Sequence, residues 1–376
     1  MSAKDSKLPK ICVIEGVIDI SSMVCDELCN LGFDAWTNKD GDYSQADVLI
    51  IPADSVALKL MRDRGMSFKK NMIIILWLVD PLPPPGLTAS SDLIGQRIAG
   101  LDWRFIFPGQ LGQIIHKYFP LGREIMRLGR WVYIRKLRNE FKRSGTLNYL
   151  DCPDREWERV MVRGYRFENH DQDNCVNHVF AMTAAMQRFL AGRGVDIDFI
   201  PVGYHPAFGE NLRLERDIDV LFLGRINNKR RASILNKLDR ELSAEKIKLE
   251  IVDKECYGDE RTQLLNRTKI SLDLPRVPWD FGAGRFLMSM SCCAMVVTEG
   301  NCPKEPYIQD VHYVQAGESN LSTTILSYLR NEQQRLRITN EAYNFITKKI
   351  TMRRSVLDII QNTNLVNTSQ LCISGE

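Results

Sequence analysis

The stretch VLFLGRINNKRR, residues 220–231, decides how this 376-residue chain is expected to fold. Its first four residues are apolar, which predicts a buried strand, and Gly224 then ends the run. From residue 231 onward, apolar side chains recur at helical spacing. A strand, a basic glycine turn and a helix start together indicate an anion site, because backbone N–H groups, the helix dipole and guanidinium groups all favour negative charge. The alternative for this stretch alone is a solvated basic loop after an ordinary strand.

The second half of the chain continues this alternation of strands and helices. Further strands are expected at 247–252, 270–274 and 295–298, and helices at 231–242, 258–266 and 285–291. The loop PRVPWDFGAG, residues 275–284, leads into the last of these helices, and one long terminal helix is expected at 342–361. Such an alternation predicts a parallel sheet covered by helices on both faces.

The first half shows the same pattern. Strands are expected at 11–14, 47–51, 73–79 and 103–107, and helices at 21–31, at 56–64 and from residue 111 onward. The segment DPLPPPG, residues 80–86, follows the third clear strand and is expected to be a stiff loop at the carboxyl edge of the sheet.

The fold class that follows is α/β, with two Rossmann-like domains whose parallel sheets face an inter-domain cleft. The N-terminal domain is expected at 1–204 and the C-terminal domain at 205–345. A terminal helix and tail, 346–376, is expected to pack back toward the N-terminal domain. In such folds ligands bind at the carboxyl ends of the strands, in the cleft between the domains.

Composition favours a globular protein of the cytoplasm. The chain is 44% hydrophobic and 26% charged, its net charge is +3, and it has neither a signal-peptide start nor an apolar run that could span a bilayer. Its ten cysteines form no CxxC pair, which indicates reduced thiols. His170 and His178 flank an acidic, amide-rich segment that fits no metal-ligand spacing, so we expect a solvated loop there and no metal.

Four sequence segments follow one another in the second half of the chain: DVLFLGR at 219–225, TKISLDL at 268–274, GAGRFLMSMSCCAMVVTEG at 282–300 and EPYIQDVHYVQA at 305–316. This order resembles the C-terminal domain of group 1 glycosyltransferases with the two-domain GT-B fold, in particular the spore-maturation, CgeB-type branch. The resemblance covers about 200–345, and IPVGYHPAFG at 200–209 resembles the inter-domain linker. It implies a sugar nucleotide held by the C-terminal domain, an acceptor on the N-terminal domain, and no obligatory metal.

The resemblance assigns expected roles to the glycine turn. Arg225, after Gly224, matches the arginine of the family's Gly-Arg turn, which contacts the donor diphosphate. The family's partner lysine stands six residues after the glycine, where this chain has Arg230, with Lys229 one residue earlier, so either could serve.

A second group of donor-binding residues is expected sixty residues later. Arg285 begins a helix and matches the arginine of the CgeB-type branch. Gly282 and Gly284 would let backbone N–H groups approach a phosphate closely.

Two positions depart from the family pattern. Many members carry two glutamates eight residues apart, the second on the ribose. Here the first position falls near Asp280, and the second is Met288, which accepts no ribose hydrogen bond. Either Glu299 or a backbone group takes this role, or the donor site is degenerate.

Three loop residues have both a functional and a structural interpretation. Asp80 could position an acceptor hydroxyl or act as a base, or it could cap the proline turn. His205, in the linker, could contact the donor or be a structural histidine. Gly16 could lie near a substrate or form an ordinary turn.

Residues 123–143, REIMRLGRWVYIRKLRNEFKR, form the strongest charge anomaly. A basic amphipathic helix with Trp131 can lie on an anionic membrane or bind a polyanionic acceptor. The alternative is a surface helix that packs on the N-terminal sheet. No nucleic-acid-binding module is recognisable, so no nucleic acid is expected.

The function expected is a cytoplasmic glycosyltransferase of the hexosyltransferase type, peripheral to the inner face of the membrane if residues 123–143 bind lipid. It would use a nucleotide-sugar donor without a cofactor, UDP-sugar being favoured over GDP- or dTDP-sugar, and would retain anomeric configuration. The acceptor is open: a small molecule, a glycan, a lipid-linked group or a protein. The alternatives are a binding or scaffold protein of the same fold that lost its chemistry, and a sugar-nucleotide epimerase.

Overall fold

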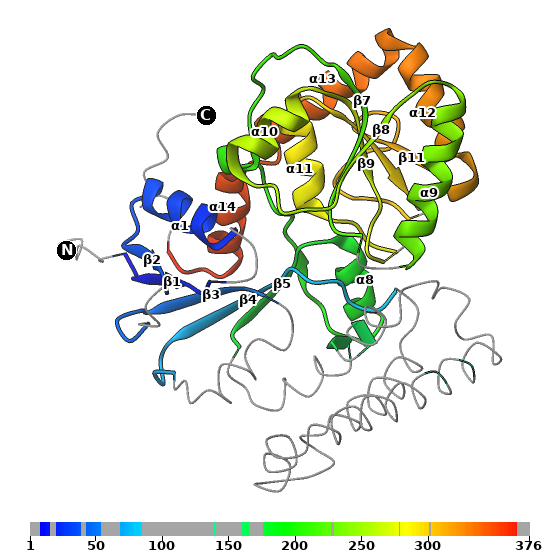
Figure 1. Cartoon of the computed structure of the whole chain (residues 1–376). Helices are drawn as coiled ribbons and strands as arrows, with labels where there is room; N and C mark the ends of the chain where they lie inside the picture. Colours follow the sequence, from blue (N-terminus) through cyan, green and yellow to red (C-terminus); the bar gives the residue numbers. More distant parts are fainter. Residues whose placement is uncertain are drawn as a thin grey trace, which may run out of the picture.

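The computed structural model describes residues 8–15, 20–38, 43–53, 68–84, 135, 139, 160–161, 163–164, 176–226, 229–277, 279–300 and 302–366, and Figure 1 shows the whole chain. The expected elements at 56–64, 103–107, 111 onward and 123–143 lie outside these residues, apart from 135 and 139. Gly16 and His170 also lie outside them. No helix in the described part of the chain is both long and apolar enough to cross a membrane.

The N-terminal sheet has six parallel strands in the order β2-β1-β3-β4-β5-β6. They are β1 (Ile11–Val13), β2 (Ala35–Thr37), β3 (Val48–Ala53), β4 (Ile73–Leu78), β5 (His178–Ala181) and β6 (Asp198–Phe199). Helices α1 (Ile20–Asn30) and α8 (Ala184–Ala191) accompany it. β4 is buried along nearly its whole length because the sheet is covered on both faces.

The C-terminal sheet has five parallel strands in the order β11-β10-β9-β7-β8. They are β7 (Ile218–Leu223), β8 (Leu249–Val252), β9 (Thr268–Asp273), β10 (Met295–Glu299) and β11 (Val314–Ala316). Its α-helices are α9 (Lys229–Ala244), α10 (Gly258–Asn266), α11 (Ala283–Ser291), α12 (Leu321–Arg330) and α13 (Glu332–Lys348).

The predicted fold class is confirmed: the chain is α/β, with two Rossmann-like units of parallel strands, as in a GT-B fold. Apolar residues of β7 and β9 pack against α9 and α12 in one core cluster of the C-terminal unit. A second cluster joins both units, since it holds Trp77 of β4 together with Phe286 of α11 and Ile359 near the C-terminus.

The expected single helix at 342–361 is wrong, because the chain breaks it into two. α13 ends at Lys348, and α14 (Met352–Asn362) begins after Thr351, whose hydroxyl accepts a hydrogen bond from Arg354 N. At the break the chain crosses the linker: Met352 N donates to Tyr204 O over 2.7 Å. α14 packs beside α1 of the N-terminal unit, as Figure 1 shows in red and blue. The terminal helix thus belongs spatially to the first unit.

The segment around His178 also differs from expectation. His178 begins strand β5, and burial lowers the pKa of its imidazole. It pairs with Ile75 of β4 and is therefore part of the sheet rather than of a solvated loop.

Candidate functional site

The order of the C-terminal sheet places a switch point between β7 and β9. From β7 the chain goes to β8 on one side, and then to β9 on the other side. Ligands of open parallel sheets bind at the carboxyl ends of the strands at such a point, because the connecting loops there turn in opposite directions. Leu223 ends β7 and Asp273 ends β9. The glycine turn at Gly224 follows β7 at this edge.

Gly224 makes this turn in a conformation that favours glycine. Its φ is +151°, and its N–H donates to Val252 O of β8 over 3.1 Å. A Cβ atom at this position would lie 3.5 Å from Nη1 of Arg285. The two parts of the predicted clamp, separated by sixty residues in sequence, therefore meet in space.

Arg285 is held at the switch point by a carboxylate. It lies in the first turn of α11, whose N-cap is Gly282, and its Nε is 3.3 Å from Oδ1 of Asp273. The other oxygen of Asp273 accepts a hydrogen bond from Thr298 Oγ1 over 3.1 Å. β9, β10 and α11 thus fix this guanidinium together.

Arg230, near the start of α9, pairs with Glu299 at the end of β10. Both side chains are largely buried, at 15% and 8% exposed. Burial raises the pKa of Glu299, and the neighbouring Arg230 opposes this shift. Arg230 and Arg285 therefore reach the same edge of the sheet from two different helices.

Four buried polar atoms of this cluster have no hydrogen-bond partner among the described residues: Nη1 of Arg230, Nη1 of Arg285, Oδ1 of Asp273 and Oε2 of Glu299. Oδ1 of Asp273 still has its ion pair with Arg285. Native structures leave few buried polar atoms unsatisfied, so such a concentration is typical of a site that a ligand completes.

Arg231 is a further member of the arginine cluster, and it was not among the predicted site residues. It is 4% exposed, and its Nη1 donates to Arg225 O over 3.1 Å. Burial lowers the pKa of its guanidinium to about 9, and Arg285 is the next cause, followed by an opposing effect of Asp273. Crowded cations of this kind favour an anion. The sequence signal was present, because Arg231 directly follows Arg230 in the basic turn.

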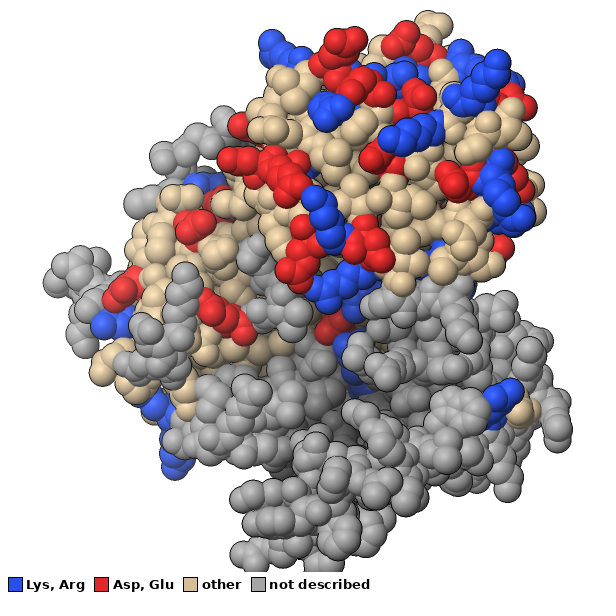
Figure 2. Space-filling view, in the orientation of Figure 1, with Lys and Arg blue, Asp and Glu red and all other residues tan. Residues whose placement is uncertain are grey.

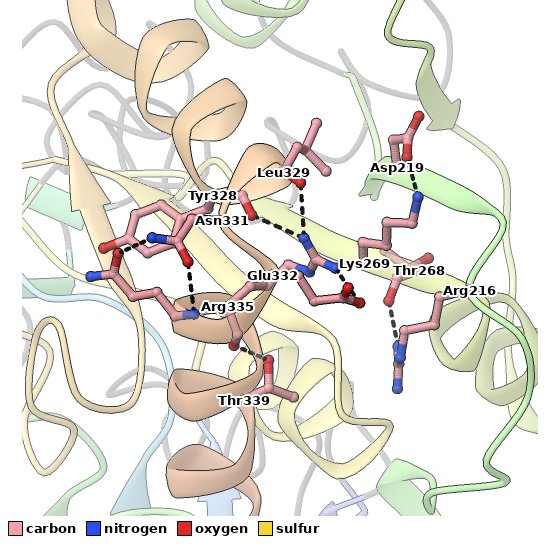
Figure 3. Close-up of polar contacts among 11 residues, drawn as sticks. Arg216, Asp219, Thr268, Lys269, Tyr328, Leu329, Asn331, Glu332, Arg335 and Thr339 are labelled. Carbon is pink, nitrogen blue, oxygen red and sulfur yellow. Dashed lines mark hydrogen bonds and ion pairs between the residues drawn. The ribbon is translucent and has the colours of Figure 1, made fainter.

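The arginines that the sequence predicts to bind the donor all have acidic partners. Arg225 pairs with Glu255, and both side chains are mostly exposed. Figure 2 shows Lys, Arg, Asp and Glu interspersed over the visible face of the C-terminal unit. Arg335 also has an acidic partner, Glu332, and in addition it donates from Nη1 to the carbonyls of Tyr328 and Leu329 at the end of α12, as Figure 3 shows. Arg335 ties one helix to the next, whereas Arg230 and Arg285 each have a buried N–H group with no hydrogen-bond partner in the part of the chain that the structure describes.

The carboxyl edge of the N-terminal sheet meets the loop before α11. Trp279 Nε1 donates to Leu82 O over 2.9 Å, and Thr183 Oγ1 donates to Asp280 Oδ2 over 3.1 Å. Leu82 belongs to the proline-rich loop after β4, and Thr183 caps α8 after β5. Loops from both sheets therefore join beside the start of α11.

Asp280 is buried in this junction, which raises its pKa to about 6. Phe281 N donates to its Oδ1 over 2.8 Å, and this hydrogen bond, Lys304 and Thr183 oppose the shift. Asp280 thereby ties the loop before α11 to the start of α8, a structural role that the family pattern did not predict.

Asp80 lies in the same proline-rich loop. Its Oδ2 is 3.1 Å from Nη2 of Arg163, and its side chain is 24% exposed. The structure thus gives Asp80 a cationic partner and leaves part of the carboxylate accessible.

The remaining predicted residues are placed as follows. Gly284 lies in the first turn of α11, where a Cβ would touch Met288 and Phe208 at 3.8 Å. His205 caps a short 3₁₀ helix, with Ala207 N donating to its Nδ1 over 3.2 Å, and its Nε2 is 3.9 Å from Asp26 of α1. None of these His205 contacts involves the arginine cluster. Lys229 begins α9, and its side chain lies outside the described part of the structure.

Within the described ranges, no group of three or more His, Cys, Asp or Glu residues is arranged to hold a metal ion.

No protein-family model matches the chain, and no curated protein matches it in sequence. Among solved structures, TarM of S. aureus is 11% identical with a TM-score of 0.47, and the match covers 92% of this chain. This chain spans 58% of the length of TarM. HepE of Anabaena, in complex with UDP-glucose, is 10% identical with a TM-score of 0.44, over 95% of this chain and 100% of HepE. A glycosyltransferase of Rickettsia africae is 11% identical with a TM-score of 0.45, over 95% of this chain and 98% of its own.

Proposed function

We propose that this chain transfers a sugar from a nucleotide-diphosphate sugar to an acceptor and binds the donor diphosphate in the arginine cluster at the ends of β7, β9 and β10. The observation that carries the proposal is that the buried Nη1 groups of Arg230 and Arg285 at the switch point have no hydrogen-bond partner among the residues that the structure describes. Both belong to residues that the family resemblance selects independently. A diphosphate supplies the acceptor oxygens that these groups lack.

The expected chemistry is electrostatic. As the bond between the sugar and the diphosphate breaks, negative charge grows on the leaving group. Arg225, Arg230 and Arg285 would stabilise that charge, with Lys229 as a further candidate, and preorganised cations of this kind are a dominant source of rate enhancement. Gly224, Gly282 and Gly284 would add backbone N–H groups at short range.

The N-terminal unit would present the acceptor. Asp80 is our candidate for positioning the acceptor hydroxyl, because it lies in the loop whose Leu82 carbonyl touches Trp279. Its carboxylate is paired with Arg163 and its side chain is 24% exposed, so part of it is accessible to a hydroxyl group. Retention of anomeric configuration, independence of metal and the hexosyl class are what the family resemblance implies for this reaction.

The base and ribose contacts define the narrower proposal. We favour UDP-sugar over GDP- and dTDP-sugar, and the CgeB-type branch within the family. Met288 offers no acceptor for a ribose hydroxyl, whereas Glu299 has a buried Oε2 without a hydrogen-bond partner in the described ranges. His205 supports a donor contact least, since its contacts are with Asp26 and Ala207.

Titration of the full chain with UDP-, GDP- and dTDP-sugars tests the proposal. We expect heat of binding with at least one donor, UDP-sugar first, and slow hydrolysis of that donor to the nucleoside diphosphate. Absence of binding by all three would contradict the proposal.

A second function, a binding or scaffold protein without catalysis, is favoured by Met288 and by the acidic partners of Arg225, Arg230 and Arg285. Both functions predict binding of a nucleotide. Donor hydrolysis or sugar transfer above the uncatalysed rate would exclude the second one.

The cellular location and the membrane contact belong to the same proposal. We place the protein in the cytoplasm, with residues 123–143 as a contact to anionic membrane, and expect no nucleic acid as partner. Co-sedimentation with vesicles of phosphatidylserine and phosphatidylcholine tests the membrane contact. Equal sedimentation with neutral vesicles would argue against it.

A further inference from the structure

In this structure Glu299 is the anion that occupies Arg230. It ends β10 and is 6% exposed, and its Oε1 is bound by Nη2 of Arg230. The pair lies at the carboxyl edge of the sheet, where Arg285 and Asp273 form the neighbouring ion pair. Bidentate binding of a phosphate uses two N–H groups of one guanidinium, so a phosphate on Arg230 and the carboxylate of Glu299 compete for the same donors.

The surroundings of Glu299 disfavour its charge once Arg230 is withdrawn. In the described part of the chain, the charged groups that face it are Arg230 from α9, Asp273 at the end of β9 and Glu318 from the short helix Glu318–Asn320. Two of these three are carboxylates, and burial acts in the same direction. A carboxylate that loses Arg230, the cation that faces it among the described residues, is stabilised by taking up a proton.

We propose that Glu299 is a built-in competitor of the diphosphate: ligand binding takes Arg230 from Glu299, and the released carboxylate takes up one proton. The inference rests on the proposed function, since it names how that same site is regulated. It predicts tight binding at low pH and weaker binding as the pH rises. A hydrogen bond from a ribose hydroxyl to Glu299 would not produce this dependence of affinity on pH.

The test uses three forms of the full chain: wild type, Glu299→Gln and Glu318→Gln. The probes are UDP and inorganic pyrophosphate, titrated at constant ionic strength between pH 5.5 and 7.5. Glu318→Gln is the matched control, because it removes the same charge from a neighbouring carboxyl that does not hold Arg230. Each ligand is titrated into all three proteins. The ionisation of the ligand itself therefore cancels in the ratio of the affinities of two proteins at the same pH.

At pH 7 we expect Glu299→Gln to bind both probes about tenfold more tightly than wild type, and Glu318→Gln to stay within about twofold. The affinity of wild type relative to Glu299→Gln should fall by up to about tenfold per pH unit within this range. Wild type titrated in two buffers of different ionisation enthalpy should show uptake of about one proton per ligand. This last measurement needs no variant and holds even if Glu299→Gln folds poorly.

The outcomes separate the two proposals. If wild type binds UDP without proton uptake and Glu299→Gln binds it no better, the competitor is overturned while the proposed function stands. If pyrophosphate binds with proton uptake but UDP does not bind, the competitor stands and the nucleotide assignment falls. If neither probe binds to wild type or to Glu299→Gln, both proposals fall.

Discussion

At the scale of single residues, Arg230 and Arg285 are the two side chains that favour binding of an anion. Each is fixed by a carboxylate, Glu299 and Asp273 respectively, and each keeps one buried N–H group without a hydrogen-bond partner in the described part of the chain. Leaving a buried donor unsatisfied costs about 1–3 kcal/mol. An anion at the switch point would recover that cost, which is a physical reason to expect ligand binding there.

Asp280 provides a prediction on stability against pH. Burial raises its pKa to about 6 in the folded chain, against about 3.9 in an unfolded one. Because the folded pKa is the higher one, the stabilising contribution of Asp280 is fully present below about pH 4 and is lost as the pH rises through about 6. The free energy of unfolding of wild type, relative to Asp280→Asn, should fall by about 2–3 kcal/mol from pH 4 to pH 7.

Urea denaturation of both proteins at four pH values measures this difference. Asparagine keeps an oxygen that accepts from Phe281 N, and its Nδ2 can donate to the Thr183 hydroxyl in place of the present bond, so both contacts can persist without the charge. A difference between the two proteins that does not vary with pH would show that Asp280 is ionised as easily in the folded chain as in water.

The sequence predicted the local part of this site and missed the part that depends on strand order. Gly224 and the basic turn are contiguous, so a run of apolar residues followed by glycine and arginine was sufficient. The pairing of Arg230 with Glu299 spans 69 residues and requires β10 to lie beyond β9 in the sheet. Whether His205 and Lys229 contact the donor stays a prediction.

At the scale of elements, the break between α13 and α14 is the main departure from expectation. Apolar periodicity across 342–361 continues through the break, so the pattern gave no signal to stop. The stop comes from tertiary structure: Tyr204 N donates to Ile350 O over 2.6 Å, and Tyr204 pairs with Thr351 as an isolated bridge. Short strands such as β2 and β6 were missed for a similar reason, since two or three residues show no period.

Gly203 permits the close approach of the linker to the break between α13 and α14. A Cβ atom there would lie 2.1 Å from the backbone carbonyl of Thr351, a contact that no side-chain movement relieves. Gly203→Ala should lower the free energy of unfolding by at least about 3 kcal/mol, as measured by urea denaturation.

Gly317→Ala is the control for this change. A Cβ at Gly317 meets nothing within 4 Å, and its φ of −67° suits any residue. Its effect should stay within about 0.5 kcal/mol. Equal effects of the two substitutions would show that the chain crossing at Gly203 does not constrain the backbone.

At the scale of the whole molecule, the two Rossmann-like units share one hydrophobic cluster. The chain passes between them twice, through the linker around Tyr204 and through the break after α13, and α14 returns to pack on α1. Polar contacts add to this junction, including an ion pair of 2.6 Å between Arg188 and Glu305. The domain boundaries at 204/205 and 345/346 stay a prediction.

A shared core predicts that the units unfold together. Ile359 of α14 is 1% exposed in that cluster, so Ile359→Ala should cost about 2–4 kcal/mol. Circular dichroism and tryptophan fluorescence should give coincident urea transitions in wild type and in the variant. Gln361→Ala, at an exposed position of the same helix, should leave both transitions unchanged.

Two separated transitions, of which Ile359→Ala moves only one, would contradict a shared core. They would instead describe two independent units joined by a linker.

At the scale of function, we propose that the switch point of the C-terminal sheet holds a diphosphate. Calorimetric titration of UDP into wild type, Arg285→Ala and Arg267→Ala tests it most directly. Arg267 is the matched control: it is an exposed arginine paired with Asp217 at the opposite, amino edge of the same sheet. We predict that wild type binds UDP, that Arg285→Ala weakens binding about 10- to 100-fold, and that Arg267→Ala changes it less than about twofold. Equal affinities of wild type and Arg285→Ala for UDP would contradict the claim.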